Sequence, residues 1–143
     1  MNRNEFIEAY HEFIDTALSA ALKAMREGLL ALDSDIDQKK ADERDIFHYG
    51  LRFAVDGTAP ELVDKIISNI AAQEKDEYTR ILKTIQKEAV MCIQQGFNSR
   101  QLHYILNSYT DLPIASEEAR LGDTEDEDEL RYEHEEGRYD AET

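Results

Sequence analysis

The chain has 143 residues, which is enough for one domain with its own core and too few to expect two. Its 32 acidic and 16 basic residues give a formal net charge of −16, which disfavours nucleic acid and anionic membrane surfaces and favours partners with basic or mixed-charge faces. Since no apolar run approaches the roughly 18 residues of a membrane span and the first residues lack the apolar core of a signal peptide, we expect a soluble cytoplasmic protein.

The first predicted element is a long amphipathic helix from Asn4 to about Leu32. Its apolar residues recur at spacings of three and four, as one face of a helix requires. The main apolar positions are Phe6, Tyr10, Phe13, Ala17, Ala21 and Met25. The polar residues 33–45, DSDIDQKKADERD, then predict a loop or a frayed helix end.

A shorter apolar helix is expected from Ile46, and the stretch VDGTAPELV should join it to the next helix. Gly57 can take the left-handed conformation that ends a helix. Thr58 can cap the following helix with Glu61 as its capping-box partner, and Pro60 suits a first turn. The alternative, a ligand-holding loop, lacks the further glycines and the Lys of a phosphate loop.

Two apolar stripes follow, at residues 62–70 and 78–93, separated by the polar QEKDE at 73–77. They predict either one long helix or two. Gly96 should end this element, and Asn98 with Gln101 can cap a last helix before Pro113. Because no segment alternates with a period of two, residues 1–114 predict an all-α bundle of four to five helices.

The composition changes at about Ala115. Residues 117–143 carry 13 acidic and three basic residues and few large apolar ones. Such a segment buries too little apolar surface to offset its ordering entropy, so we expect a disordered, mobile acidic tail over residues 115–143. A short helix within residues 127–136 is the alternative for part of it.

The acidic DSDID stretch resembles the start of a calcium loop, with Asp33, Asp35 and Asp37 at alternate positions. The match fails at Gln38, where the loop needs Gly, and at Arg44, where it needs a bidentate Glu. We therefore expect a solvated acidic helix end and no calcium site.

The remaining residue types give no catalytic, cofactor or metal site. The four histidines lie too far apart in the sequence for a metal-binding spacing, and we expect them at the surface or its boundary. They are His11, His48, His103 and His134. The lone Cys92, in AVMCIQQ, should pack as a small buried hydrophobe. No nucleophile stands in a catalytic motif, so we do not expect an enzyme.

Two stretches together resemble the cytoplasmic segment of the motility protein A (MotA) family, the stator subunits of flagellar motors. They are AMREGLLALDSDID, residues 24–37, and FHYGLRFAVDGTAPELVDKIISNIAAQEKDEY, residues 47–78, with REGLLAL as the hallmark. Residues 80–113 are similar to the cytoplasmic tail of that family, with Gly96, Asn98 and Arg100 in matching places and Ser99 where the family has Pro. The family's membrane helices are missing, so the resemblance implies no ion conduction.

The resemblance implies a charged face that meets the rotor switch protein FliG. The family's acidic position falls at Asp33, whereas its basic position falls at Met25 and Arg26 matches the Arg beside it. Because Arg26 and Asp33 are seven residues apart, we expect them on nearly one helix face, with two further charged residues beside them. The candidate partner-binding residues are Lys23, Arg26, Glu27 and Asp33. The alternative is that these charges only solvate an exposed helix.

Two functional hypotheses follow. The first is a soluble MotA-like protein-interaction module of the flagellar motor, which binds FliG or stator components without conducting ions. The second is an acidic sequestering protein whose C-terminal tail binds a basic partner. The sequence leaves the oligomeric state open.

Overall fold

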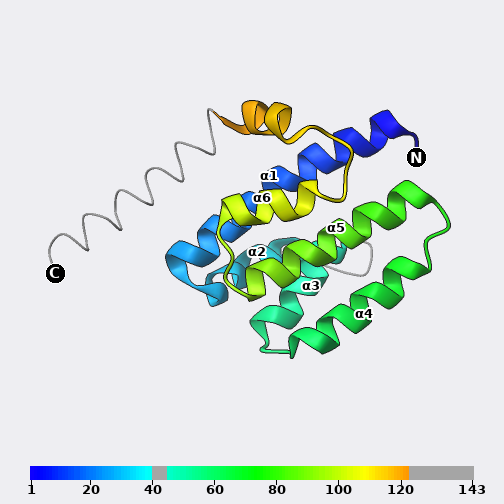
Figure 1. Cartoon of the computed structure of the whole chain (residues 1–143). Coiled ribbons are helices and arrows are strands. Elements are labelled where there is room, and N and C mark those ends of the chain that lie inside the picture. Colours follow the sequence, from blue (N-terminus) through cyan, green and yellow to red (C-terminus); the bar gives the residue numbers. More distant parts are fainter. Residues whose placement is uncertain (40–44, 123–143) are drawn as a thin grey trace, which may run out of the picture. The chain divides into compact units, whose positions relative to one another are not determined.

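The computed structural model describes residues 1–39 and 45–122 (Figure 1). These residues confirm the all-α fold class, because they contain helices and no strand. The elements in chain order are α1 (Arg3–Glu27), the 3-10 helix η1 (Leu29–Leu32), α2 (Asp33–Lys39), α3 (Ile46–Val55), α4 (Pro60–Ala72), α5 (Glu77–Gln94) and α6 (Ser99–Asn107). In these ranges we find no helix with the length and apolar character that crossing a bilayer requires.

The first helix is shorter than the sequence pattern predicts. α1 begins with a capping box between Asn2 and Glu5 and ends at Glu27, not near Leu32. The cause is Gly28, whose φ of 92° and ψ of 159° leave the helical region. Residues 29–32, predicted as the end of the long helix, form η1, and residues 33–39, predicted as a loop or a frayed helix end, form α2.

The stretch VDGTAPELV joins α3 to α4, as predicted, but the cap of α4 differs from the prediction. Gly57 has a φ of 81°, which confirms the left-handed conformation at the end of α3. The predicted capping box of Thr58 and Glu61 is wrong, because the N-cap position belongs to Ala59 and no side chain caps α4. Pro60 occupies the first turn, where its fixed φ already favours the helix and makes a side-chain cap less necessary.

The later helices, α4 to α6, have ends that the sequence largely predicts. The apolar stripes at 62–70 and 78–93 belong to separate helices, α4 and α5, with the break at residues 73–76. The predicted end of α5 is confirmed, since Gly96 has a φ of 82°. The predicted cap of α6 is confirmed as well, because Asn98 and Gln101 form a complete capping box.

α5 is the central helix of the fold, since it contacts α1, α3, α4 and α6. Figure 1 shows α4 and α5 as an antiparallel pair joined by their short turn, and α6 packs on α1 as well as on α5. Cys92 on α5 is buried as predicted, and burial, together with the charge of Glu88, raises the pKa of its thiol to about 11. The buried residues of α5 are Ile85, Ala89, Val90, Cys92 and Ile93.

α3 approaches its neighbours closely at Gly50. A Cβ atom at this position would lie 2.8 Å from Ile67 Cδ1 on α4 and 2.8 Å from Val90 Cγ2 on α5. Both distances are far below a normal carbon contact, so only glycine fits without displacing these side chains. The position is therefore specified by helix packing and not by a backbone conformation.

The described residues fall into two compact units, Met1–Tyr109 and a second that begins at Thr110. In the second unit residues 114–122 are helical, and the backbone N–H groups of Ser116 and Glu117 donate to the carbonyl of Pro113. Residues 115–122, at the start of the predicted acidic tail, are thus helical. The predicted mobility of residues 123–143, and the alternative helix within 127–136, lie outside the described residues.

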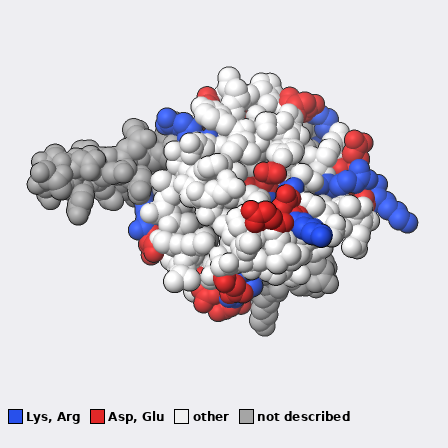
Figure 2. All heavy atoms as spheres, turned by 60° about the horizontal axis from the view of Figure 1, so that its bottom comes forward, with Lys and Arg blue, Asp and Glu red and all other residues white. Residues whose placement is uncertain are grey.

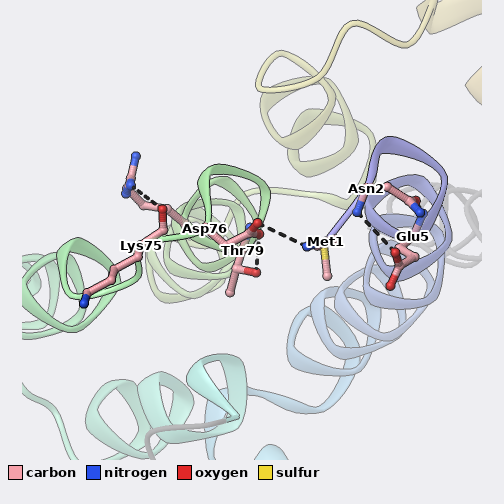
Figure 3. A network of polar contacts seen from close by, with 7 residues as sticks. Met1, Asn2, Glu5, Lys75, Asp76 and Thr79 are labelled. Atoms are coloured by element: carbon pink, nitrogen blue, oxygen red, sulfur yellow. Dashed lines mark hydrogen bonds and ion pairs between the residues drawn. The ribbon is translucent and has the colours of Figure 1, made fainter.

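A polar network joins the start of α1 to the start of α5 (Figure 3). The Met1 ammonium donates to Asp76 Oδ1 over 3.1 Å, while Asp76 Oδ2 accepts from the Thr79 backbone N–H at 2.8 Å and from Thr79 Oγ1 at 2.7 Å. The two bonds from Thr79, followed by the Met1 ammonium, lower the pKa of Asp76 to about 2. The carboxylate form of Asp76 is therefore the form that the fold favours.

The Asp76 network predicts a pH dependence. Because the pKa of Asp76 is about 2 in the folded state and near 3.9 in an unfolded chain, its contribution to stability is complete above about pH 4. This contribution should disappear as the pH falls from about 4 to about 2. Thr79→Val removes the hydroxyl donor, so NMR titration should find the Asp76 carboxyl midpoint shifted upward. Thr84→Val is the control, since Thr84 Oγ1 donates to the Arg80 carbonyl and to no carboxylate. An Asp76 midpoint that Thr79→Val leaves unchanged would contradict this account.

The close approach at Gly50 predicts that Gly50→Ala destabilises the protein by about 1–3 kcal/mol through overpacking, although Ala is the better helix former. Val90→Ala vacates part of the same space. The double variant should therefore lose less stability in urea denaturation than the two single variants lose together. Strict additivity would show that the two positions do not compete for space.

Candidate functional site

The four predicted partner-binding residues lie where α1 ends and the chain turns into α2. Gly28 makes this turn, and its N–H donates to the Ala24 carbonyl at 2.8 Å. η1 then packs on α1 and α3, and α2 packs on α3. We call this region, the C-terminal half of α1 with η1, α2 and α3, the α1–α3 corner.

Ion pairs fix α2 on both sides of this corner. Arg52 on α3 donates through Nη1 to Asp33 Oδ1 at 2.6 Å, and through Nη2 to Asp37. On the other side, Lys23 on α1 donates to Asp35 Oδ2 at 3.1 Å. The hydrogen bond to Asp33, together with that to Asp37, raises the pKa of Arg52. The alternating acids of DSDID therefore hold α2 to α1 and α3.

The structure separates the predicted residues into two groups. Lys23 and Asp33 take part in the ion pairs of the corner, whereas Arg26 and Glu27 are exposed at the end of α1. The premise that Arg26 and Asp33 share a helix face is wrong, because α1 ends before Asp33 and Asp33 begins α2. A spacing of seven residues places two side chains on nearly the same face only within one continuous helix.

Leu30 is the most exposed large apolar side chain of the described residues, at 73%. It lies in η1, where residues repeat every three positions. Leu32 is buried at 1% exposure and Leu29 is half-buried, so Leu30, about 120° away from both, faces outward. Leu30 is not among the residues that the sequence predicts to bind a partner. The sequence feature that could have indicated a turn at Leu30 is Gly28 in REGLLAL, because glycine is typical just after the C-terminus of a helix.

Arg52 is likewise not among the predicted partner-binding residues. The sequence feature that points to a basic partner is the spacing of Asp33 and Asp37, which lie on one face of a helix at positions i and i+4. A basic residue on a neighbouring helix is the expected partner of such a pair. Which helix would supply it depends on the tertiary fold.

The predicted surface or boundary location is wrong for two histidines, because His48 is 8% exposed and His103 is 4% exposed. At the start of α3, Asp45 caps the helix by accepting from the His48 backbone N–H at 3.1 Å. The second carboxylate oxygen of Asp45 lies 2.8 Å from His48 Nδ1 and fixes the imidazole. His11 is half-buried, and His134 lies outside the described residues.

The described surface carries both signs of charge. Figure 2 shows one face of the molecule, on which Lys and Arg side chains lie next to Asp and Glu in several small groups. Residues 1–39 and 45–122 contain no group of three or more His, Cys, Asp or Glu that could hold a metal ion.

No protein-family model, no curated protein and no solved structure matches the chain. The resemblance to the MotA family therefore rests on the sequence motifs alone, and the fold and geometry described above are the independent basis for a functional proposal.

The ion pairs of the corner predict a response to charge reversal. Asp33→Lys places a cation against Arg52, so it should lower the urea midpoint of unfolding. The double variant Asp33→Lys with Arg52→Glu restores opposite charges and should recover part of the loss. Glu27→Lys, at an exposed site at the end of α1, is the control for the change in net charge. If Asp33→Lys and Glu27→Lys have equal effects on the midpoint, the pair with Arg52 does not stabilise the corner.

Proposed function

We propose that the chain is a protein-interaction module that binds its partner through the turn between α1 and α2. The observation that carries the proposal is Leu30, which is 73% exposed on a turn that contacts three helices. Arg26 and Glu27 lie just before it at the exposed end of α1. An apolar side chain with charged residues around it has the composition of an interface centre and its rim.

The turn is suited to binding because it is held in place. η1 contacts α1, α2 and α3, and Leu32 anchors it in the core at 1% exposure. Ion pairs of Lys23 and Arg52 hold α2, which follows it directly. A preorganised surface loses little conformational entropy on binding, so a small contact area can still give measurable affinity.

The identity of the partner comes from the sequence resemblance. The exposed turn is part of REGLLAL, the stretch that resembles the MotA hallmark. We infer a partner from the flagellar motor, either the rotor switch protein FliG or a stator component, bound without ion conduction. Exposed charges such as Arg26 would contribute mainly to steering, so binding should be weak and sensitive to salt.

A second candidate function is sequestration of a basic partner by the acidic C-terminal tail. The observation that favours it is charge, since residues 123–143 carry 11 acidic and two basic residues. Such a segment attracts cationic surfaces without a defined contact geometry. In this case the helical body would serve only as a carrier.

The two functions predict different responses to single substitutions in the full chain. Leu30→Ser should weaken binding to the C-terminal domain of a cognate FliG about tenfold, the loss expected when a buried Leu side chain is removed from an interface. Leu62→Ser is the matched control, because Leu62 is 50% exposed on α4 and far from the turn in sequence. Isothermal titration at low salt measures the dissociation constants of both variants.

A chain whose acidic residues at 123–143 are replaced by amides separates the alternatives. If this chain loses binding while Leu30→Ser keeps it, the tail carries the function. If Leu30→Ser and Leu62→Ser weaken binding equally, the turn is not the binding surface. Absence of heat at near-millimolar concentration would reject FliG as the partner.

A further inference from the structure

Apolar burial contributes little to the position of α2. The helix has seven residues, and an isolated helix of this length is not stable in water. Of residues 33–37, Ile36 is buried at 2% exposure, and the others are half-buried or exposed. By contrast, α6 is also short but buries Leu102 and Leu106 completely. α2 therefore needs further contacts to stay helical and docked.

These further contacts are ion pairs with the helices on either side. Arg52 of α3 pairs with Asp33 and Asp37. Lys23 of α1 pairs with Asp35. All five side chains are between 31% and 67% exposed, so water and dissolved ions reach them. Exposed ion pairs are weak and are screened by salt, so the contacts that hold α2 are of a kind that salt weakens.

The segment before α2 is anchored without these ion pairs. Leu32, the last residue of η1, is 1% exposed, and η1 packs on α1 and α3. Loss of the ion pairs therefore leaves η1 in the core. Proteins open locally where few buried apolar contacts must be broken, and the boundary between η1 and α2 is such a place.

We propose that α2 is an electrostatic latch, which undocks from α1 and α3 as a unit while the longer helices stay folded. Salt sets the fraction of undocked chains, because it weakens the ion pairs and not the apolar packing around α5. Undocking frees the Lys23 ammonium and the Arg52 guanidinium from their carboxylates. An anionic partner that binds these two cations therefore shifts the population toward the undocked state. The latch lies beside the Leu30 turn, but its undocking does not depend on which partner that turn binds.

Amide hydrogen exchange of the full-length chain, measured by NMR, tests the latch. The reporters are the amides of Ile36 and Asp37 in α2, compared with Val90 in α5 and Leu106 in α6. Raising NaCl from about 50 mM to about 1 M should speed exchange in α2 about fivefold relative to the intrinsic rate, the effect expected when exposed ion pairs are screened. Val90 and Leu106 should lose no protection.

Three substitutions, read at the Asp37 amide, separate the ion pairs from other effects. Arg52→Gln removes the partner of two α2 carboxylates, so exchange should be about fivefold faster at low salt and respond less to added salt. Arg80→Gln makes the same change in net charge on α5, where the guanidinium donates to backbone carbonyls of the α4–α5 turn, and should leave α2 unchanged. Ile36→Ala removes apolar contact and no charge, so it should speed exchange and keep the salt response.

Three results would overturn the latch. If the α2 amides exchange as slowly as Val90 at every salt concentration, α2 opens only with the whole fold. If salt leaves the α2 exchange rates unchanged, the ion pairs do not hold the helix. If Arg52→Gln and Arg80→Gln have equal effects on α2, the helix responds only to overall charge.

Discussion

The first unit of the fold depends on the packing of α1, α3, α4 and α6 around α5, and α3 approaches α4 and α5 closely at Gly50. α3 has no side chain there, so Ile67 of α4 and Val90 of α5 fill the space against its backbone. Close approach of this kind maximises dispersion contacts, which are individually weak and fall off steeply with distance. α5 also contacts α1 and α6, so a displacement of α3 would be transmitted through α5 to both of them.

The α1–α3 corner is held by a different kind of interaction. α2 has seven residues, too few for an isolated helix to be stable in water, and its buried apolar residue is Ile36 at 2% exposure. The ion pairs of Lys23 and Arg52 also hold α2 to α1 and α3. Because these pairs are partly exposed, salt screens them, whereas this screening does not weaken the apolar packing around α5.

Much of the fold could be predicted from the sequence, because helix ends are encoded by local residues. Asn98 and Gln101 fulfil their predicted roles, and Gly57 and Gly96 have the predicted positive φ. Gly28 also has a positive φ, but the apolar pattern continues on both sides of Gly28 and favoured an uninterrupted helix. The predicted cap at Thr58 is wrong because Pro60 and Thr58 are alternative ways to begin α4, and the helix begins with Pro60. The candidate site was less predictable, because the pairing of Asp33 with Arg52 and the burial of His48 depend on how α3 packs.

Gly28 is the residue that gives the corner both of its surfaces. By ending α1 it converts the next four residues into a 3-10 turn, in which Leu30 and Leu32 cannot face the same side. Leu30 then lies outside and Leu32 inside, where Leu32 and His48 both line a pocket of about 430 Å³. Had α1 continued to Asp33, Asp33 would lie in the last turn of α1 and not in the first turn of α2. Its pairing with Arg52 follows from the same break, so one glycine conformation determines the exposed turn, the position of α2 and a wall of the pocket.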